Sequence, residues 1–337
     1  ALMRIQWQKR VLHFRRPAAT SRGALTERVT FIVEAHTETG CGYGECCTMP
    51  GLLPQPTETE LNHWSKETSR LGNIPTDVTM PSPIRFALEC ALSQAHHPGQ
   101  PRWDSPFSRG ETGIAIHHLV WMDTADRMLA AMADGIQRGF TCLKLKVGAL
   151  PFEEEICLLR EAHAAFPQAE IRVDANGAFS PTEALRKLDA LAAAGVSSIE
   201  QPIRPGQWQE MRELCQHTPL PIAVDEELIA AHRDAERFLD TVMPQALVIK
   251  PSLHGGLVAA EQLAHMAEQR GIRLWINSAL ESHIGLTALA EWCGAHAPDT
   301  LHGLGTGRLF TDDFPKRVYL QNAQLHYDHL HYNGPGI

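Results

Sequence analysis

Five charged residues, each closing a short apolar and β-branched run, recur along the chain at nearly constant intervals. Subtraction of the residue numbers gives spacings of 28, 26, 25 and 25 residues between Lys146, Asp174, Glu200, Asp225 and Lys250. Each spacing has the length of one strand plus one helix. Because the carboxyl ends of the strands in parallel β/α folds meet around one pocket, we expect these five side chains to face one another.

Strand and helix signals alternate from about residue 114 onward. Apolar strand candidates occupy residues 114–120, 142–147, 171–175, 198–200, 222–225, 246–250, 274–278 and 301–304. Amphipathic stretches between them, such as residues 152–166, 181–194, 207–215 and 256–270, have the period of helices. Eight strands that alternate with helices predict a TIM-type barrel of the α/β class.

The first 108 residues have a different pattern. Residues 29–34 predict a strand, the glycine-rich residues 40–45 predict a turn, and residues 81–97 predict a helix. The tail, residues 311–337, returns to a strand pattern at residues 317–320, and we expect it to pack on the first lobe. The expected organisation is a catalytic barrel over residues 109–310 and an α+β capping domain formed by residues 1–108 together with the tail.

Composition limits the partners that the chain can have. The 337 residues carry a formal net charge of −9 without a cluster of Lys and Arg, which argues against nucleic-acid and anionic-membrane partners. No apolar run approaches the roughly 18 residues that span a bilayer, and we expect no export signal. Eight cysteines without a Cys-x-x-Cys pair predict reduced thiols and a cytoplasmic enzyme. The sequence leaves the oligomeric state open.

Lys144 and Lys146 share one face of their predicted strand, because side chains alternate along a strand. Leu143, Leu145 and Val147 occupy the other face, toward the expected outer helices. Two lysines therefore point into the barrel, where desolvation and like charge lower the pKa of an ammonium group. Alternation alone leaves open which lysine acts as a base, but Lys146 lies nearer the carboxyl end of the strand, where barrel active sites form.

Three carboxylates, Asp174, Glu200 and Asp225, end successive predicted strands. Singly each could be a helix cap, but caps do not require acids at three successive strand ends. Without a histidine among them, these acids suit a hard cation, namely Mg²⁺ or, as an alternative, Mn²⁺. Arg172 and Asn176 share the face of Asp174 by the period of two, so we expect them to support that acid or to contact the substrate.

Lys250 ends the run of residues 246–250 and would reach the pocket from the side opposite Lys146. A lysine on each side of a metal-bound anion suits the removal of a proton next to a carboxylate group. The metal and one lysine stabilise the enediolate as charge develops, while the other lysine moves the proton. Active sites of the enolase superfamily use this combination of a lysine base with magnesium.

These residues resemble the muconate-lactonising branch of the enolase superfamily, and within it the o-succinylbenzoate synthase family. The resemblance covers nearly the whole chain. It includes the two lysines of residues 144–146, the three acids, Lys250, the N-terminal lobe and an incomplete last barrel unit. Specific motifs stand at residues 42–45 (Gly-Tyr-Gly-Glu), 50–52 (Pro-Gly-Leu), 172–176 (Arg-Val-Asp-Ala-Asn), 248–253 (Val-Ile-Lys-Pro-Ser-Leu), 278–286 (Ser-Ala-Leu-Glu-Ser-His-Ile-Gly-Leu) and 303–306 (Gly-Leu-Gly-Thr).

The resemblance implies a (β/α)7β barrel and a magnesium-dependent reaction of menaquinone biosynthesis. In that reaction 2-succinyl-6-hydroxy-2,4-cyclohexadiene-1-carboxylate loses water on one face, by way of an enediolate, and becomes 2-succinylbenzoate. By resemblance, Lys146 is the general base and then the acid that helps hydroxide leave, and Lys250 stabilises the enediolate by its charge. The implied partner is a small-molecule carboxylate.

The resemblance also implies roles outside the catalytic lysines. Gly303 and Gly305 would border the succinyl end of the substrate, with the Ser278 hydroxyl nearby, and we place Glu281 of the same motif in this group. Residues 20–25 correspond to a loop that closes over the pocket in this family. Within that loop, the lid residues are Ser21, Arg22 and Gly23.

Several alternatives share the lysines and the metal site. Dipeptide epimerases have an Asp-x-Asp at the last barrel strand, where this chain has Gly303-Leu304-Gly305. N-succinylamino acid racemases and muconate cycloisomerases use the same groups and stay open. A catalytically inactive metal-binding barrel that serves as an interaction module is a further alternative, but such a protein has no reason to keep two desolvated lysines.

Overall fold

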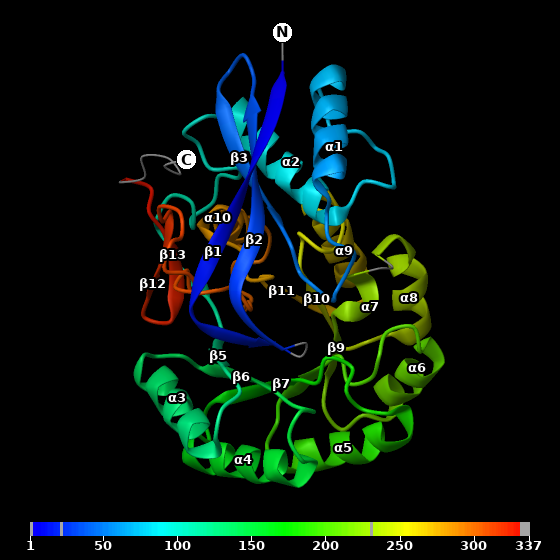
Figure 1. Cartoon of the computed structure of the whole chain (residues 1–337). Helices are drawn as coiled ribbons and strands as arrows, with labels where there is room; N and C mark the ends of the chain where they lie inside the picture. Colours follow the sequence, from blue (N-terminus) through cyan, green and yellow to red (C-terminus); the bar gives the residue numbers. More distant parts are fainter. Residues whose placement is uncertain (1–2, 21–22, 230–231, 331–337) are drawn as a thin grey trace.

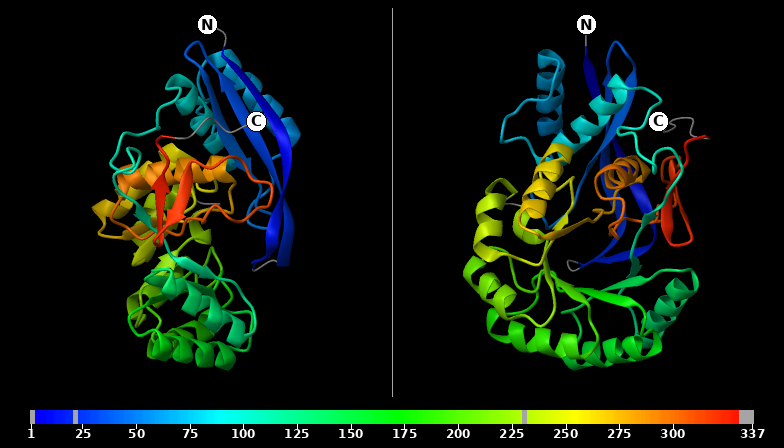
Figure 2. Two further views of the ribbon diagram at one scale, coloured as in Figure 1. Left: turned by 90° about the vertical axis from the view of Figure 1, so that its left-hand side faces the viewer. Right: turned by 180° about the vertical axis from the view of Figure 1, so that it is seen from behind.

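The computed structural model describes residues 3–20, 23–229 and 232–330, which contain an antiparallel capping sheet and a curled parallel sheet (Figure 1). Two further views show the long blue strands of the capping sheet rising beside the curled sheet, with their lower end reaching over it (Figure 2). Helices surround the outside of the curled sheet. No helix in the described ranges is long and apolar enough to cross a membrane.

The capping sheet has three strands, β1 (Arg4–Thr20), β2 (Gly23–His36) and β3 (Cys41–Cys47), paired antiparallel in this order. Two helices, α1 (Glu58–Leu71) and α2 (Ser82–His96), pack on one face of this sheet through a shared apolar cluster. The expected strand at residues 29–34 is part of β2, and the expected helix at residues 81–97 is α2.

The predicted turn at residues 40–45 is wrong, because most of this segment lies in strand β3. The glycines are needed for a close approach instead. A Cβ atom at Gly42 would lie 2.1 Å from the carbonyl oxygen of Ala91, and one at Gly44 would lie 1.9 Å from that of Ala87. Helix α2 therefore crosses β3 with backbone nearly in contact, which only glycine allows.

The curled sheet has seven parallel strands in the order β11-β10-β9-β8-β7-β6-β5. These strands are β5 (His118–Val120), β6 (Cys142–Lys146), β7 (Glu170–Asp174), β8 (Ser198–Glu200), β9 (Ile222–Val224), β10 (Ala246–Ile249) and β11 (Arg273–Ile276). The intervening helices are α3 (Ala125–Gln137), α4 (Phe152–Ala165), α5 (Pro181–Ala193), α6 (Trp208–His217), α7 (Glu226–Ile229), α8 (Ala235–Val242), α9 (Leu257–Gln269) and α10 (His283–His296). This alternation confirms a TIM-barrel-like fold.

The two faces of the curled sheet differ in chemistry. The outward residues of the strands, such as Leu145, Val173 and Ile199, belong to the large apolar cluster shared with the surrounding helices. The inward residues alternate with them and include Lys144 and Glu200, both buried. Burial of the outward face drives the assembly, so the inward face is available for charged groups.

The edges of the curled sheet are joined through the segment that contains His302 and Gly303. An isolated parallel bridge pairs Asn277, which follows β11, with Gly303, and another pairs Ile116, which precedes β5, with His302. The expected single strand at residues 114–120 is wrong, because β4 (Ile114–Ala115) belongs to a different sheet from β5.

The tail supplies the partners of β4. Strands β12 (Val318–Gln321) and β13 (Gln324–Tyr327) form an antiparallel hairpin, and β13 pairs with β4. The hairpin thus contacts the curled-sheet side of the molecule, while the preceding Phe310 packs on Phe14 of β1. The division of the chain at residues 108 and 310 stays a prediction.

A buried ion pair joins the parts of the molecule. The guanidinium of Arg102 lies 3.3 Å from Glu291 of α10, and the exposed fractions of the two side chains are 5% and 2%. Arg102 also donates to the carbonyl oxygens of Tyr43 in β3 and Cys90 in α2. The hydroxyl of Tyr327 in β13 lies 3.3 Å from the same carboxylate. One arginine thus links the capping sheet, α10 and the tail hairpin.

Replacement of this arginine is expected to destabilise the whole fold. Arg102→Ala leaves Glu291 buried without its cation, which costs about 3–5 kcal/mol in the free energy of unfolding. Urea unfolding followed by circular dichroism measures the loss. The matched control is Arg109→Ala, because Arg109 is 45% exposed and pairs with Asp104 and Glu111 at the surface; it should cost less than about 1 kcal/mol. Equal effects of the two variants would contradict the proposed importance of the buried pair.

Candidate active site

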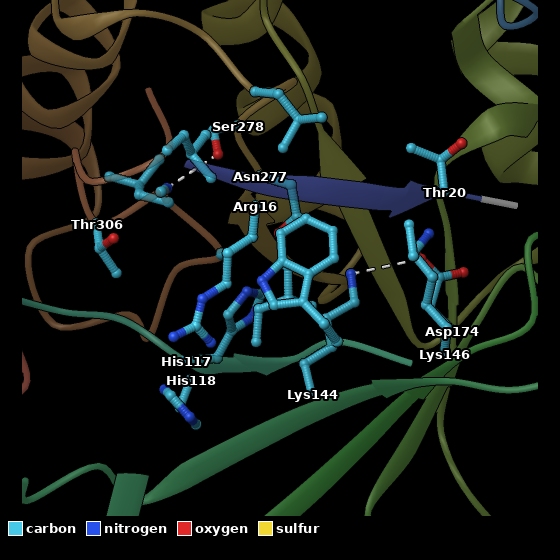
Figure 3. Close-up of a pocket in the computed structure, with 18 of the residues that line it drawn as sticks. Arg16, Thr20, His117, His118, Lys144, Lys146, Asp174, Asn277, Ser278 and Thr306 are labelled. Atoms are coloured by element: carbon cyan, nitrogen blue, oxygen red, sulfur yellow. Dashed lines mark hydrogen bonds and ion pairs between the residues drawn. The ribbon is translucent and has the colours of Figure 1, made fainter. Parts of the chain in front are cut away.

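A cavity of about 770 Å³ opens at the carboxyl ends of the curled strands, a volume typical of small-molecule sites. Residues from several strands point into it, as Figure 3 shows for Lys144, Lys146, Asp174 and Asn277. The first two strands of the capping sheet contribute Arg16, Ala19, Thr20 and Leu25. The segment after β3 contributes Met49, Pro50 and Leu52, which are apolar.

Lys146 is the last residue of β6 and lies in the wall of the cavity. Its Nζ donates a 2.9 Å hydrogen bond to Oδ1 of Asn176, a residue that follows β7 with a left-handed φ of 45°. Burial lowers the pKa of Lys146; Asp174 opposes this shift, whereas the charges of Lys144 and Lys250 add to it. A lowered pKa makes the neutral amine more accessible than in an ordinary lysine, so Lys146 is suited to accept a proton.

Lys144, two residues earlier on the same strand, has the opposite character. Its Nζ lies 2.7 Å from Glu200 Oε2 and 3.5 Å from Asp174 Oδ2. Burial alone would lower the pKa of Lys144, but the two carboxylates outweigh burial and raise it. The geometry therefore distinguishes the two lysines that alternation could not: Lys144 stays a cation, while Lys146 can lose its proton more readily.

Lys250 follows β10 and contacts Asp225, the residue after β9. Burial disfavours the charged form of Lys250, but Asp225 and Glu200 more than compensate and raise its pKa. Strands β7, β8 and β9 separate β6 from β10 in the sheet. Lys146 and Lys250 therefore approach the cavity from opposite sides, with the three acids between them.

The three acids are buried and depend on positive charge. Burial raises the pKa of Asp225 well above its usual range and that of Asp174 to about 6. For Glu200, Lys144 and Lys250 outweigh burial and lower the pKa. Buried carboxylates at adjacent strand ends can stay ionised only with cations beside them.

The donor set fits a hard divalent cation. In the part of the chain that the structure describes, Asp225 Oδ1 is buried without a hydrogen-bond partner. Among the described residues, the carboxylate oxygens of Asp174, Glu200 and Asp225 are not all within 4.8 Å of one another. The ammonium groups of Lys144 and Lys250 contact Glu200 and Asp225 and compensate their negative charge. An all-oxygen set with an unpartnered buried oxygen is what Mg²⁺ or a similar ion binds.

The glycine-rich segment lies beside Ser278. Ser278 Oγ accepts a 2.9 Å hydrogen bond from the backbone N–H of Gly305, so its own proton can be donated into the cavity. A Cβ at Gly303 would lie 1.9 Å from Asn277 Oδ1, whereas one at Gly305 would meet nothing closer than 3.5 Å. Gly303 is thus required for packing, and Gly305 keeps space open in the cavity.

The lining of the cavity does not include several of the predicted residues: the metal-ligand candidates Glu200 and Asp225, which are buried at the strand ends, and the substrate-site candidates Arg172 and Glu281. Arg172 contacts Glu170 at 2.7 Å, and its guanidinium lies 4.4 Å from the centre of the Trp275 ring, inside the curled sheet. Glu281 is buried, accepts a 2.9 Å hydrogen bond from Ser252 Oγ and accepts another from the backbone of Ala279. Both side chains support the strand ends rather than reach the cavity.

The lid residues are only partly placed. Ser21 and Arg22 lie outside the described residues. Gly23 begins β2 with a φ of 114°, and Thr20 Oγ1 donates to its carbonyl oxygen at 2.7 Å. Thr20, the last residue of β1, lines the cavity, so the described residues before this loop lie next to it.

Other cavity residues were not predicted from the sequence. Asn277 Nδ2 lies 3.4 Å from Glu200 Oε1, and it shares the inward face of Trp275 by the period of two, a signal that was present in the sequence. His117 is buried, and burial lowers its pKa well below the usual range. Arg16 also lines the cavity, but no periodic pattern in the long strand β1 marks it.

Known proteins are similar to this chain in fold and in sequence. The family model described as "Enolase C-terminal domain-like" matches residues 127–336. The o-succinylbenzoate synthase of Desulfotalea psychrophila is 39% identical, over 96% of this chain and 98% of that protein. The crystal structure of MenC from Desulfotalea psychrophila has a TM-score of 0.83 with 34% identity and covers 97% of this chain and 100% of that one.

The fold is shared more widely than the sequence. The L-Ala-D/L-Glu epimerase of Bacillus subtilis also has a TM-score of 0.83, over 97% of this chain and 96% of that one, but only 20% identity. That likeness reflects the fold alone. The family model and the 39% identical relative, which extend over the lysines and acids of the cavity, show that the chain belongs to the enolase superfamily and, within it, to the o-succinylbenzoate synthase family.

Proposed function

We propose that this cavity carries out the o-succinylbenzoate synthase reaction, the magnesium-dependent dehydration of 2-succinyl-6-hydroxy-2,4-cyclohexadiene-1-carboxylate to 2-succinylbenzoate. The observation that carries the proposal is the pair of lysines on opposite sides of one cavity. Lys146 has a lowered pKa, and Lys250 is held charged by Asp225. The family membership supports the same reaction.

Lys146 performs both proton transfers of the reaction. As the neutral amine it takes the proton from the ring carbon that bears the carboxylate, which leaves an enediolate. The resulting ammonium group gives that proton to the departing hydroxyl, so water leaves and the ring becomes aromatic. One base suffices for both steps because the proton and the hydroxyl leave from the same face. Asn176, which accepts a hydrogen bond from Lys146, positions the amine.

Lys250 and the acids control the charge that develops. A bound magnesium ion, held by Asp174, Glu200 and Asp225, would supply positive charge at the substrate carboxylate. Lys250 holds its charge on the other side of the substrate, where it stabilises the enediolate. Lys144 remains paired with Glu200 and keeps that acid ionised.

The succinyl end of the substrate binds beside the glycine-rich segment. Ser278 has a hydroxyl proton to donate, and Gly305 leaves the space that a carboxylate needs. The segment has no acid that would hold the amine of a dipeptide, which favours the synthase over an epimerase.

We also propose that residues 301–304 act as the eighth barrel strand, which gives the (β/α)7β count. We propose in addition that residues 21–23 form the lid. A cytoplasmic location remains a prediction from the cysteine pattern.

Removal of the base is expected to abolish turnover. Lys146→Ala should lower kcat by roughly 10²–10⁴ or more, because the other two lysines among the described cavity residues, Lys144 and Lys250, are held charged by carboxylates. Loss of the diene absorbance of the substrate measures the rate, and circular dichroism verifies the fold. Lys66→Ala, which removes an exposed lysine of α1, is the control and should keep full activity. If Lys146→Ala kept a rate near that of the wild type, Lys146 would not be the base.

Metal removal is expected to silence the enzyme reversibly. Exhaustive chelation should stop turnover, and Mg²⁺ should restore it, with Mn²⁺ as the comparison. Glu200→Gln should raise the Mg²⁺ concentration needed for half-maximal recovery at least tenfold, whereas Glu153→Gln, at an exposed position of α4, should not. Activity that persists after complete chelation would exclude the proposed role of the metal.

The pH profile of kcat/KM is expected to report the base. Burial lowers the pKa of Lys146 from its usual value of 10.5, and any cation held by the acids adds to this shift. Since the neutral amine is the active form, kcat/KM should rise with pH and reach its plateau below pH 10.5. Stopped-flow assays across this range measure the ascending limb. A limb centred at or above the ordinary lysine pKa would contradict a desolvated base.

A further inference from the structure

A second group of metal-binding side chains lies on the capping sheet. Glu34 and His36 are two residues apart on β2, so they share one face, and Cys41 at the start of β3 is the cross-strand partner of His36. One ligand atom from each of these residues lies within 4.8 Å of the other two, and within the described ranges this is the only such group of His, Cys, Asp and Glu. The proposed function makes no use of it.

The distances resemble those of a tetrahedral zinc site. Zinc–ligand bonds of about 2.0–2.3 Å at a tetrahedral angle place neighbouring ligand atoms roughly 3.3–3.8 Å apart. Glu34 Oε1 lies 3.4 Å from Cys41 Sγ and 2.8 Å from His36 Nε2. Only small side-chain adjustments would therefore open this group around a cation. All three are on paired strands, which hold their Cα atoms in place.

Gln6 completes a set of four side chains around His36. His36 Nε2 lies 2.8 Å from Glu34 Oε1 and 3.1 Å from the side-chain amide of Gln6. A half-turn of the amide brings the Gln6 oxygen to face His36. The four side chains can then present two oxygens, one nitrogen and one sulfur to a cation.

The burial of the group also suits a metal. The side chains of His36 and Glu34 are 33% and 25% exposed, so an ion can enter from solvent but is partly shielded once bound. Cys41 Sγ lies 3.4 Å from Glu34 Oε1, so a thiolate and a carboxylate at these positions would repel each other. A divalent cation between them would offset both negative charges.

We propose that Glu34, His36 and Cys41 bind a transition-metal cation of the zinc class, with Gln6 as the fourth side chain of the site. The mixed sulfur, nitrogen and oxygen ligands prefer such an ion to the hard Mg²⁺ of the catalytic cavity. The bound ion links the start of β3 to the end of β2, next to the turn at residues 37–40.

The two metal sites are independent. Strand β2 runs from Gly23 beside the catalytic cavity to His36 at its other end, and its 14 residues extend over roughly 40 Å at about 3.3 Å per residue. The β2–β3 turn lies at the top of the molecule in Figure 1, away from the curled sheet. A failure of this proposal would therefore leave the proposed catalytic function untouched, and the reverse also holds.

Cobalt absorption tests the proposal. The whole protein, saturated with Mg²⁺ to fill the catalytic site, is titrated with Co²⁺, whose bond to a thiolate gives a charge-transfer band that oxygen ligands do not give. We expect one equivalent of Co²⁺ to produce this band and Zn²⁺ to remove it. Cys41→Ser should abolish the band. Cys157→Ser, at an exposed cysteine of α4, should keep it, and so should Glu200→Gln in the catalytic site.

A second variant separates ligation from general effects on the thiol. His36→Gln should keep the Cys41 thiol but weaken Co²⁺ binding at least tenfold, while circular dichroism and turnover stay those of the wild type. Absence of the band from the wild-type protein would overturn the proposal. Its persistence in Cys41→Ser, or unchanged affinity in His36→Gln, would overturn it as well.

Discussion

Three buried carboxylates inside the curled sheet constrain the rest of the site. Asp174, Glu200 and Asp225 are buried at adjacent strand ends, and their mutual repulsion has to be balanced by cations in the same space. Lys144 and Lys250 provide that balance in the structure. Their pairing is what leaves Lys146, which donates to the neutral amide of Asn176, as the lysine whose pKa is lowered. The three lysines therefore differ in pKa because each one reaches a different neighbouring group.

Burial of the apolar outward face stabilises the sheet that carries this concentration of charge. Outward residues such as Leu143, Val173 and Ile249 join one large cluster with the helices, and their burial stabilises the sheet whatever the inward residues are. The same fold consequently serves proteins of low sequence identity, including the epimerase of Bacillus subtilis. In this chain the lining of the cavity includes the Gly303-to-Gly305 segment, which has no acid.

Much of the barrel and of its charged centre could be predicted from the sequence, because both follow from simple periods. The spacing of about 25 residues located the strand ends, and the period of two placed Lys144 and Lys146 inward. The same period also placed Arg172 inward, but it does not show how far an inward residue lies from the cavity. Arg172 lies one layer below Asp174 and stacks on Trp275. The turn predicted at residues 40–45 was wrong because these glycines are required by the close approach of helix α2, which is distant in sequence. Glu281 and Arg16 depend on tertiary contacts that no local pattern encodes.

The joining of the sheet edges by residues 302–303 has a consequence for the order in which the enzyme matures during synthesis. Ile116 and Asn277 both bridge to this segment, and Gly305 bonds Ser278. The cavity wall is therefore incomplete until residues 302–305 have left the ribosome, although Asp174, Glu200 and Asp225 emerge earlier. A nascent chain must hold those acids in an open sheet, with the edges of β5 and β11 unprotected, for the time that the last segment takes to arrive. The closing of the sheet is therefore the step that ends the exposure of these edges to misassembly.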